Sequence, residues 1–191
     1  MQDSPRSGQR LTHDEFARLV DQHQHRLHIY LAGMLRHTDL AFDLVQETFC
    51  EAWRAARKGK RPFLSGTDDL DVRRWLFRVA SNRAISLLRH SKRIRWEPLD
   101  GVEEPLLGVS DAFDERIAEG EALQAALVQL APQDVACLLL RVVHGFSAGE
   151  TGSILNMSAD NVNTRLARAK QRLRTAYMRE QQNWLKTGAH Q

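Results

Sequence analysis

Apolar residues recur every three or four positions along most of this 191-residue chain, and no segment shows the sustained alternation of apolar and polar residues typical of a β-strand. The helical pattern is clearest in residues 39–56, where the apolar side chains fall on about half of the helical circumference. This spacing constrains the fold more than any other feature of the sequence. It predicts an all-α protein.

The other half of the 39–56 helix carries carboxylates spaced four residues apart, at Asp39, Asp43, Glu47 and Glu51. Like charges at this spacing repel one another, so they do not stabilise an isolated helix. A basic binding partner would explain why they gather on one face.

The net charge of +3 conceals a strong asymmetry along the chain, since residues 1–96 carry +7, residues 97–129 carry −8 and residues 130–191 carry +4. Glycine and proline cluster inside the acidic block, as they do in interdomain linkers. The sequence therefore predicts two small helical domains, over residues 11–96 and 113–179, joined by an acidic linker over residues 97–112.

A second helix is predicted over residues 72–93, and from Arg73 to Arg95 the chain carries eight basic residues and no acidic one. Solvated helix faces usually mix charges of both signs, so a run of one sign this long favours contact with a polyanion. Within this run Trp75 and Phe77 could stack on bases, but their apolar spacing favours packing in the core.

The second predicted domain carries the signals of a helix-turn-helix. Ser147 and Glu150 have capping-box spacing before a short helix that ends near Leu155, Asn156 suits a turn with positive φ, and Ser158 can cap the next helix. Asparagine and arginine can bond base edges in the major groove, and further cations neutralise phosphates. The alternative is a solvated amphipathic helix at the end of a bundle. The outward-facing residues predicted to read duplex DNA are Asn161, Asn163, Thr164, Arg165, Arg168 and Arg172.

Three segments indicate a family: AFDLVQETF (41–49), WLFRVASNRAISLLR (75–89) and LAPQDVACLLLRVVHGFSAGETGSILNMSADNVNTRLARAKQRLR (130–174). In order and separation they resemble the extracytoplasmic-function (ECF) sigma factors of bacterial RNA polymerase. The resemblance implies an alternative sigma factor that binds core RNA polymerase, recognises minus-ten and minus-thirty-five promoter elements and promotes transcription initiation. The first domain would then bind the polymerase and melt the promoter, and the second would read the minus-thirty-five element.

The resemblance also implies roles for individual residues. Asp43, Gln46 and Glu47 match positions that dock on the coiled coil of the polymerase β′ subunit, and Asn82 matches the position lining the pocket for a base flipped out at the minus-ten element. Asn163, Thr164, Arg165 and Arg168 match minus-thirty-five contact positions. The implied partners are core RNA polymerase, through β′ and β, promoter DNA, and an anti-sigma factor. Further minus-ten contacts are expected from Arg78, Arg83, Arg89, Lys92 and Arg93.

The sequence departs from the family pattern at several places. Phe42 stands where the family usually has an acidic residue, and Asn163 replaces a common basic residue. Gly149, Thr151 and Gly152 replace residues that favour helix and core, so a weak scaffold helix is expected there. The loop over residues 57–71 is longer than usual, and in this family that loop shapes the flipped-base pocket.

Other features exclude several classes of function. The two cysteines, Cys50 and Cys137, are too few for a disulfide framework and are expected to be reduced thiols. The histidines between residues 13 and 37 lack a convincing ligand set, so they are expected to be ordinary surface side chains and not a metal site. No cofactor, catalytic set, secretion signal or membrane span is expected, which predicts a cytoplasmic protein without enzymatic activity.

Two other functions fit parts of the sequence. A stand-alone repressor or activator could use the same C-terminal reader, but it leaves the acidic helix face and the acidic linker unexplained. An enzyme built on the histidine-rich first helix would carry stoichiometric metal.

Overall fold

The computed structural model describes residues 10–64, 67–93, 123 and 126–188. The predicted acidic linker, residues 97–112, lies outside the described residues, as does most of the helix expected over residues 113–130. The described residues are helical apart from their connections and one isolated bridge between Arg10 and Leu64, so the all-α prediction is confirmed. None of the helices in these segments is long and apolar enough to cross a membrane.

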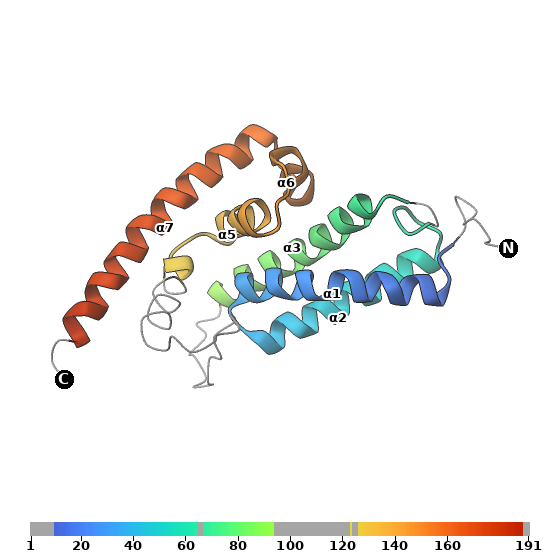
Figure 1. Cartoon of the computed structure of the whole chain (residues 1–191), viewed down its shortest axis with the longest axis horizontal. Helices are drawn as coiled ribbons and strands as arrows, with labels where there is room; N and C mark the ends of the chain where they lie inside the picture. Colours follow the sequence, from blue (N-terminus) through green and yellow to red (C-terminus); the bar gives the residue numbers. More distant parts are fainter. Residues whose placement is uncertain (1–9, 65–66, 94–122, 124–125, 189–191) are drawn as a thin grey trace.

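The N-terminal half is a bundle of three helices, α1 (His13–Leu35), α2 (Thr38–Arg57) and α3 (Asp69–Arg93) (Figure 1). Helix α1 begins with a capping box between Thr12 and Glu15 and ends at Arg36, whose φ of 56° closes the helix. The side chain of His37 caps α2 by accepting a hydrogen bond from the backbone N–H of Leu40 at 3.3 Å. Short-range sequence signals therefore fix the bounds of these two helices.

Tyr30 and Phe77 lie at the centre of the bundle core, with ring centroids 5.1 Å apart. The Tyr30 hydroxyl lies 2.7 Å from the hydroxyl of Ser81, and burial raises the pKa of Tyr30. Trp75 is half-buried and packs edge-on against Phe63 from the connecting loop. Core packing of Phe77 and partial burial of Trp75 agree with the interpretation drawn from their spacing.

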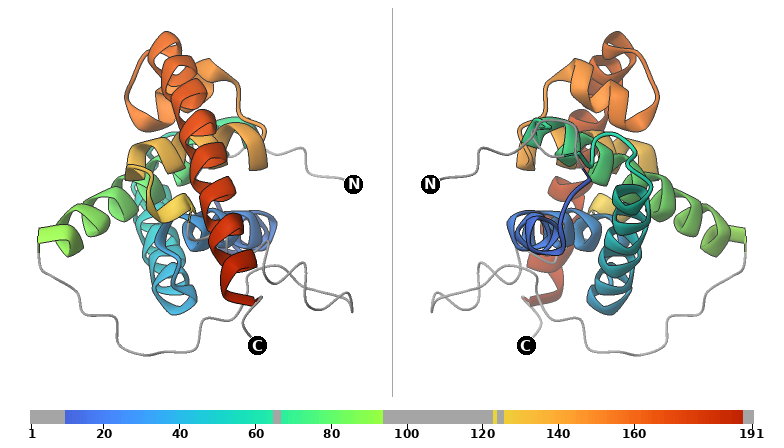
Figure 2. Two further views of the ribbon diagram at one scale, coloured as in Figure 1. Left: turned by 90° about the vertical axis from the view of Figure 1, so that its left-hand side faces the viewer. Right: turned by 90° about the vertical axis from the view of Figure 1, so that its right-hand side faces the viewer.

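The C-terminal half contains α5 (Pro132–Leu138), which continues as the π-helical turn η1 (Leu139–Val143), followed by α6 (Ala148–Leu155) and α7 (Ala159–Gly188). Pro132 lies in the first turn of α5, where a backbone N–H would have no hydrogen-bond partner within the helix, so the N–H that proline lacks is not needed. Gly145, with φ of +69°, follows η1 and turns the chain toward α6. Helix α7 packs on α5 and α6 and runs along the outer side of the molecule (Figures 1 and 2).

The two halves pack directly on each other. Helix α6 lies against α3, α5 lies against α1 and α3, and η1 lies against α1. Gly33 on α1 permits a close approach, because a Cβ at this position would lie 3.1 Å from the side chain of Leu139. One hydrophobic core therefore runs through both halves.

Candidate nucleic-acid and protein interfaces

The helix-turn-helix forms as its capping residues predict. The backbone N–H of Glu150 donates to the Ser147 hydroxyl at 3.2 Å, and the Ser147 N–H donates to the Glu150 carboxylate at 2.6 Å. Asn156 ends α6 with φ and ψ both 54°, and the Ser158 hydroxyl accepts the N–H of Asn161 at 3.2 Å. The turn therefore has the tight left-handed geometry that the asparagine indicates.

Gly152 explains one departure from the family pattern. A Cβ at this position would lie 2.5 Å from the carbonyl oxygen of Met157, closer than any unstrained contact allows. The same carbonyl belongs to the turn, whose Met157 N–H donates to Gly152 O at 2.9 Å. Thr151 is fully buried beside it. The glycine thus lets the turn fold back closely onto α6.

We expect Gly152→Ala to destabilise the helix-turn-helix by about 1–3 kcal/mol, because the added methyl group forces the turn to shift. Gly149→Ala on the same helix is the matched control. Nothing lies within 4 Å of a Cβ at Gly149, so the gain in helix propensity should raise stability by about 0.5–1 kcal/mol. Urea unfolding of the two variants measures both effects, and equal stabilities would contradict the close approach at Gly152.

Helix α7 buries one side, and all the residues predicted to read DNA except the half-buried Arg165 are exposed on it. Val162, Ala169 and Ala176 form the buried seam. At 100° per residue, five of the six residues predicted to read DNA fall within an arc of about 100° of the helix circumference. The sixth, Asn163, lies outside this arc, about 100° from Thr164. The structure therefore gathers into one strip Asn161, Thr164, Arg165, Arg168 and Arg172.

Asp134 on α5 holds two of these arginines. Its carboxylate lies 2.7 Å from Arg165 Nη1 and 3.6 Å from Arg172 Nη1, and its side chain is only 8% exposed. Arg165 is half-buried by this contact. The sequence did not indicate this role of Asp134. An acidic residue in the first turn of a helix is already explained by its favourable interaction with the helix macrodipole.

Arg83 on α3, one of the residues predicted to bind DNA, contacts the acidic face of α2. Asp43, Gln46 and Glu47 are all exposed, as docking residues must be. Arg83 on α3 donates to both Glu47 and Glu51, and the Glu51 contact is 2.8 Å long. Hydrogen bonding to Glu51 raises the pKa of Arg83. The structure thus pairs an expected minus-ten contact with an expected polymerase contact.

Asn82 is exposed on α3 and lines a pocket of about 260 Å³ between the two halves of the molecule. Arg89 lines the same pocket, Arg78 is exposed elsewhere on α3, and the side chains of Lys92 and Arg93 lie outside the described residues. None of the residues that the structure describes in 57–71 lines it. The remaining lining residues are Ile85, Ser86 and His90 from α3 and Gln133 and Leu155 from the C-terminal half.

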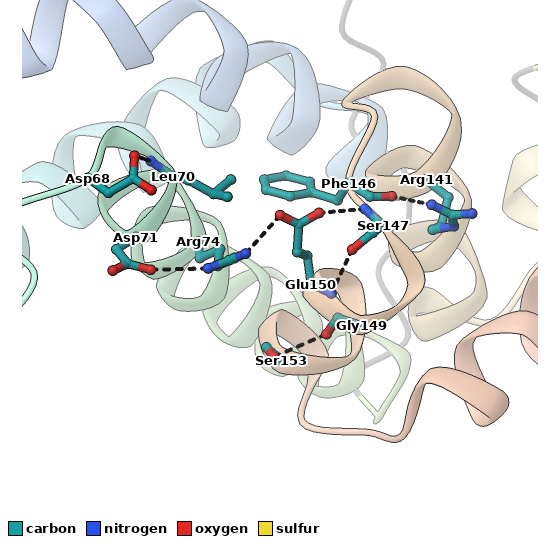
Figure 3. A network of polar contacts seen from close by, with 10 residues as sticks. All are labelled: Asp68, Leu70, Asp71, Arg74, Arg141, Phe146, Ser147, Gly149, Glu150 and Ser153. Atoms are coloured by element: carbon teal, nitrogen blue, oxygen red, sulfur yellow. Dashed lines mark hydrogen bonds and ion pairs between the residues drawn. The ribbon is translucent and has the colours of Figure 1, made fainter.

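Two other arginines of the basic run hold the halves together. Arg74 donates to Asp71 at 3.1 Å and to Glu150 at 2.9 Å, so the carboxylate that caps α6 also bonds α3 (Figure 3). Arg73 donates to the carbonyl oxygen of His144 and lies over the ring of Phe146, 4.1 Å from its centroid. Burial, with help from nearby cations, lowers the pKa of His144 to about 4. The contact between the two halves therefore combines ion pairs with aromatic packing.

The prediction that the N-terminal histidines are surface side chains is wrong for His23. This residue is buried, and its Nε2 lies 3.0 Å from the carboxylate of Asp69 on α3. Burial lowers its pKa in spite of that carboxylate.

The two cysteines differ in exposure. Cys50 is exposed, whereas Cys137 is buried, and burial raises the pKa of its thiol to about 11. Over the described segments, no three His, Cys, Asp or Glu side chains are placed to share a metal ion.

Comparison with known proteins matches both halves. Residues 19–94 match the family model for sigma-70 region 2, and residues 120–173 match that for sigma-70 region 4. The chain is 30% identical to the RNA polymerase sigma factor CarQ of Myxococcus xanthus over 162 residues, which cover 84% of this chain and 88% of that protein. It is also 30% identical to the ECF RNA polymerase sigma factor SigE of Mycolicibacterium smegmatis, over 82% of this chain but 59% of that longer protein.

Two solved structures share the fold. The sigma factor RpoE in complex with the anti-sigma factor NepR, from Bartonella quintana, superposes with a TM-score of 0.63 at 19% identity, over 85% of this chain and 96% of that one. CnrH in complex with the cytosolic domain of CnrY superposes with a TM-score of 0.59 at 23% identity, over 86% and 88%. These likenesses support the arrangement of helices.

Proposed function

Because the chain belongs to the ECF sigma factors of bacterial RNA polymerase, an alternative group that recognises promoters for transcription initiation, we propose that it acts as a complex with core RNA polymerase at a two-element promoter. In this proposal the protein works in the cytoplasm and supplies recognition and strand capture without chemistry of its own. The observation that carries it is the capped helix-turn-helix with its strip of polar and cationic side chains on α7.

The polymerase contact is assigned to the exposed face of α2. Asp43, Gln46 and Glu47 lie along this face, and their charge suits a basic coiled coil such as that of the β′ subunit. The proposal includes a further contact with the β subunit. Charge on an exposed interface rim sets association rate and partner choice, so reversing it should weaken assembly.

Promoter DNA is assigned to two surfaces. The strip on α7 would read the minus-thirty-five element, with Asn161, Arg165 and Arg168 at base edges or phosphates. Asn82, with Arg78 and Arg89 beside it on α3, would hold the flipped base and its backbone at the minus-ten element. Because Gln133 and Leu155 help to line the Asn82 pocket, a nucleotide held there would also lie against the C-terminal half.

We also propose an anti-sigma factor as a partner. RpoE of Bartonella quintana was solved in complex with the anti-sigma factor NepR, and its fold covers most of this chain. An inhibitor that stabilises the packed arrangement of the two halves would keep Gln133 and Leu155 beside the Asn82 pocket and so hinder entry of a nucleotide. Such an inhibitor needs only to bind the docked state more tightly than the separated one.

Transcription from a cognate promoter with purified core RNA polymerase tests the proposed function. The wild-type protein should direct initiation, and Asp43→Lys should weaken holoenzyme assembly at least about tenfold because it reverses the charge facing the basic partner. Asp21→Lys is the control, since Asp21 is also an exposed carboxylate but lies on α1. A protein that binds promoter DNA tightly alone and adds nothing to the polymerase would instead be a stand-alone repressor or activator.

A further inference from the structure

Phe42 is the exception on the apolar side of α2. Ala41, Leu44 and Val45 around it are buried, whereas the Phe42 side chain is 51% exposed. A single exposed apolar residue is common on protein surfaces and needs no special explanation by itself. The surroundings of this phenylalanine give it more weight.

The ring of Phe42 rests on a histidine from the neighbouring helix. The Phe42 and His28 rings are stacked with centroids 4.1 Å apart and an angle of 30° between their planes. His28 is half-buried, and burial lowers its pKa, which favours the neutral form of the imidazole in the stack. The stack fixes the orientation of Phe42 before any partner arrives, which reduces the entropy lost on binding.

Polar residues, two of them acidic, flank Phe42 along α2. Asp39 lies one turn before Phe42, Asp43 follows it directly, and Gln46 lies one turn after it, all of them exposed. Within the part of the chain that the structure describes, neither Asp39 nor Asp43 forms an ion pair, whereas Glu47 is held by Arg83. A rigid aromatic centre with a polar rim is the usual anatomy of a binding hot spot.

We propose that Phe42 is the anchor of the polymerase-binding surface, inserting between apolar side chains of a helical segment whose basic residues meet Asp39 and Asp43. The charge of the rim selects a basic partner, and the ring requires an apolar notch on that partner. This inference rests on the proposed function and adds a residue to it. At this position the chain carries an apolar ring where the family usually has an acidic residue, so burial of the ring replaces a charge contact.

The test is the dissociation constant of the full-length protein for purified core RNA polymerase. Phe42→Ala should weaken binding by about 10-fold to 100-fold, as truncation of an interface anchor does. Phe42→Leu, which keeps an apolar side chain, should stay within about threefold of wild type. The matched control is Met178→Ala, because Met178 is 48% exposed and lies on α7, which packs on α5 and α6.

A stability check and two outcomes decide the test. Since Phe42 is half exposed, all variants should unfold at nearly the same temperature, and a circular dichroism melt checks this before binding is compared. If wild type binds and Phe42→Ala binds within twofold of it, the anchor role is wrong while the proposed function stands. If the folded wild-type protein does not bind core RNA polymerase, the proposed function fails and the anchor role with it.

Discussion

Phe146→Ala should lower the free energy of unfolding by about 3–5 kcal/mol, the usual cost of removing a buried phenylalanine ring. The Phe146 ring is 1% exposed and packs against Phe77 of α3, with centroids 5.1 Å apart. It also lies under the guanidinium of Arg73. The substitution would therefore leave a cavity at the contact between the two halves and remove the aromatic ring that the Arg73 guanidinium covers.

Urea unfolding followed by circular dichroism measures this loss. Val142→Ala is the control, because Val142 lies four residues earlier in the chain and is 57% exposed, so its truncation should cost less than about 0.5 kcal/mol. If Phe146→Ala were as mild as the control, the C-terminal half would not depend on docking against α3. A change in the slope of the transition would indicate instead that the two halves unfold separately.

Asp134→Ala should cost about 2–3 kcal/mol of stability and weaken binding to minus-thirty-five DNA. Removing one partner of a buried ion pair leaves the other charge uncompensated, and the cost here falls below the usual range because the Arg165 side chain is 31% exposed. Arg172 would lose its contact with the same carboxylate. Both arginines would then be free to leave the strip of predicted readers on α7.

A double-mutant cycle isolates the pair. The stabilities of Asp134→Ala, Arg165→Ala and the double variant should show a coupling of about 1 kcal/mol or more, since the two side chains are in direct contact. Asp160→Ala serves as the control, because Asp160 is an exposed carboxylate in the first turn of α7. Additive effects of Asp134 and Arg165 would show that the carboxylate does not hold the arginine in solution.

Local signals in the sequence predicted the helix-turn-helix well. The capping box of Ser147, the left-handed turn at Asn156 and the cap at Ser158 each depend on residues within about four positions, so the sequence contains everything needed to recognise them. The buried seam through Val162 and Ala169 followed from helical periodicity for the same reason. The roles of the candidate site residues remain predictions, although Asp43 and Asn82 are exposed as those roles require.

Contacts between distant segments could not be predicted. Arg83 and Glu47 are 36 positions apart, and Arg165 and Asp134 are 31 apart. Periodicity tells which side of a helix is polar, but it does not tell which side chain lies across from it. The prediction that His23 lies on the surface failed for this reason. His23 contacts Asp69 on another helix, and a histidine in a polar stretch of sequence gives no indication of such a partner.

The internal pairing of the basic run changes how its charge can act on DNA. Each cation that contacts a phosphate releases condensed counterions, and log K falls by about 0.9 per phosphate for each tenfold rise in ionic strength. Arg73, Arg74 and Arg83 already have partners inside the protein. Fewer cations remain for phosphates than the sequence suggests, so promoter affinity should depend less steeply on ionic strength, and neutral groups such as Asn82 carry a larger share of it.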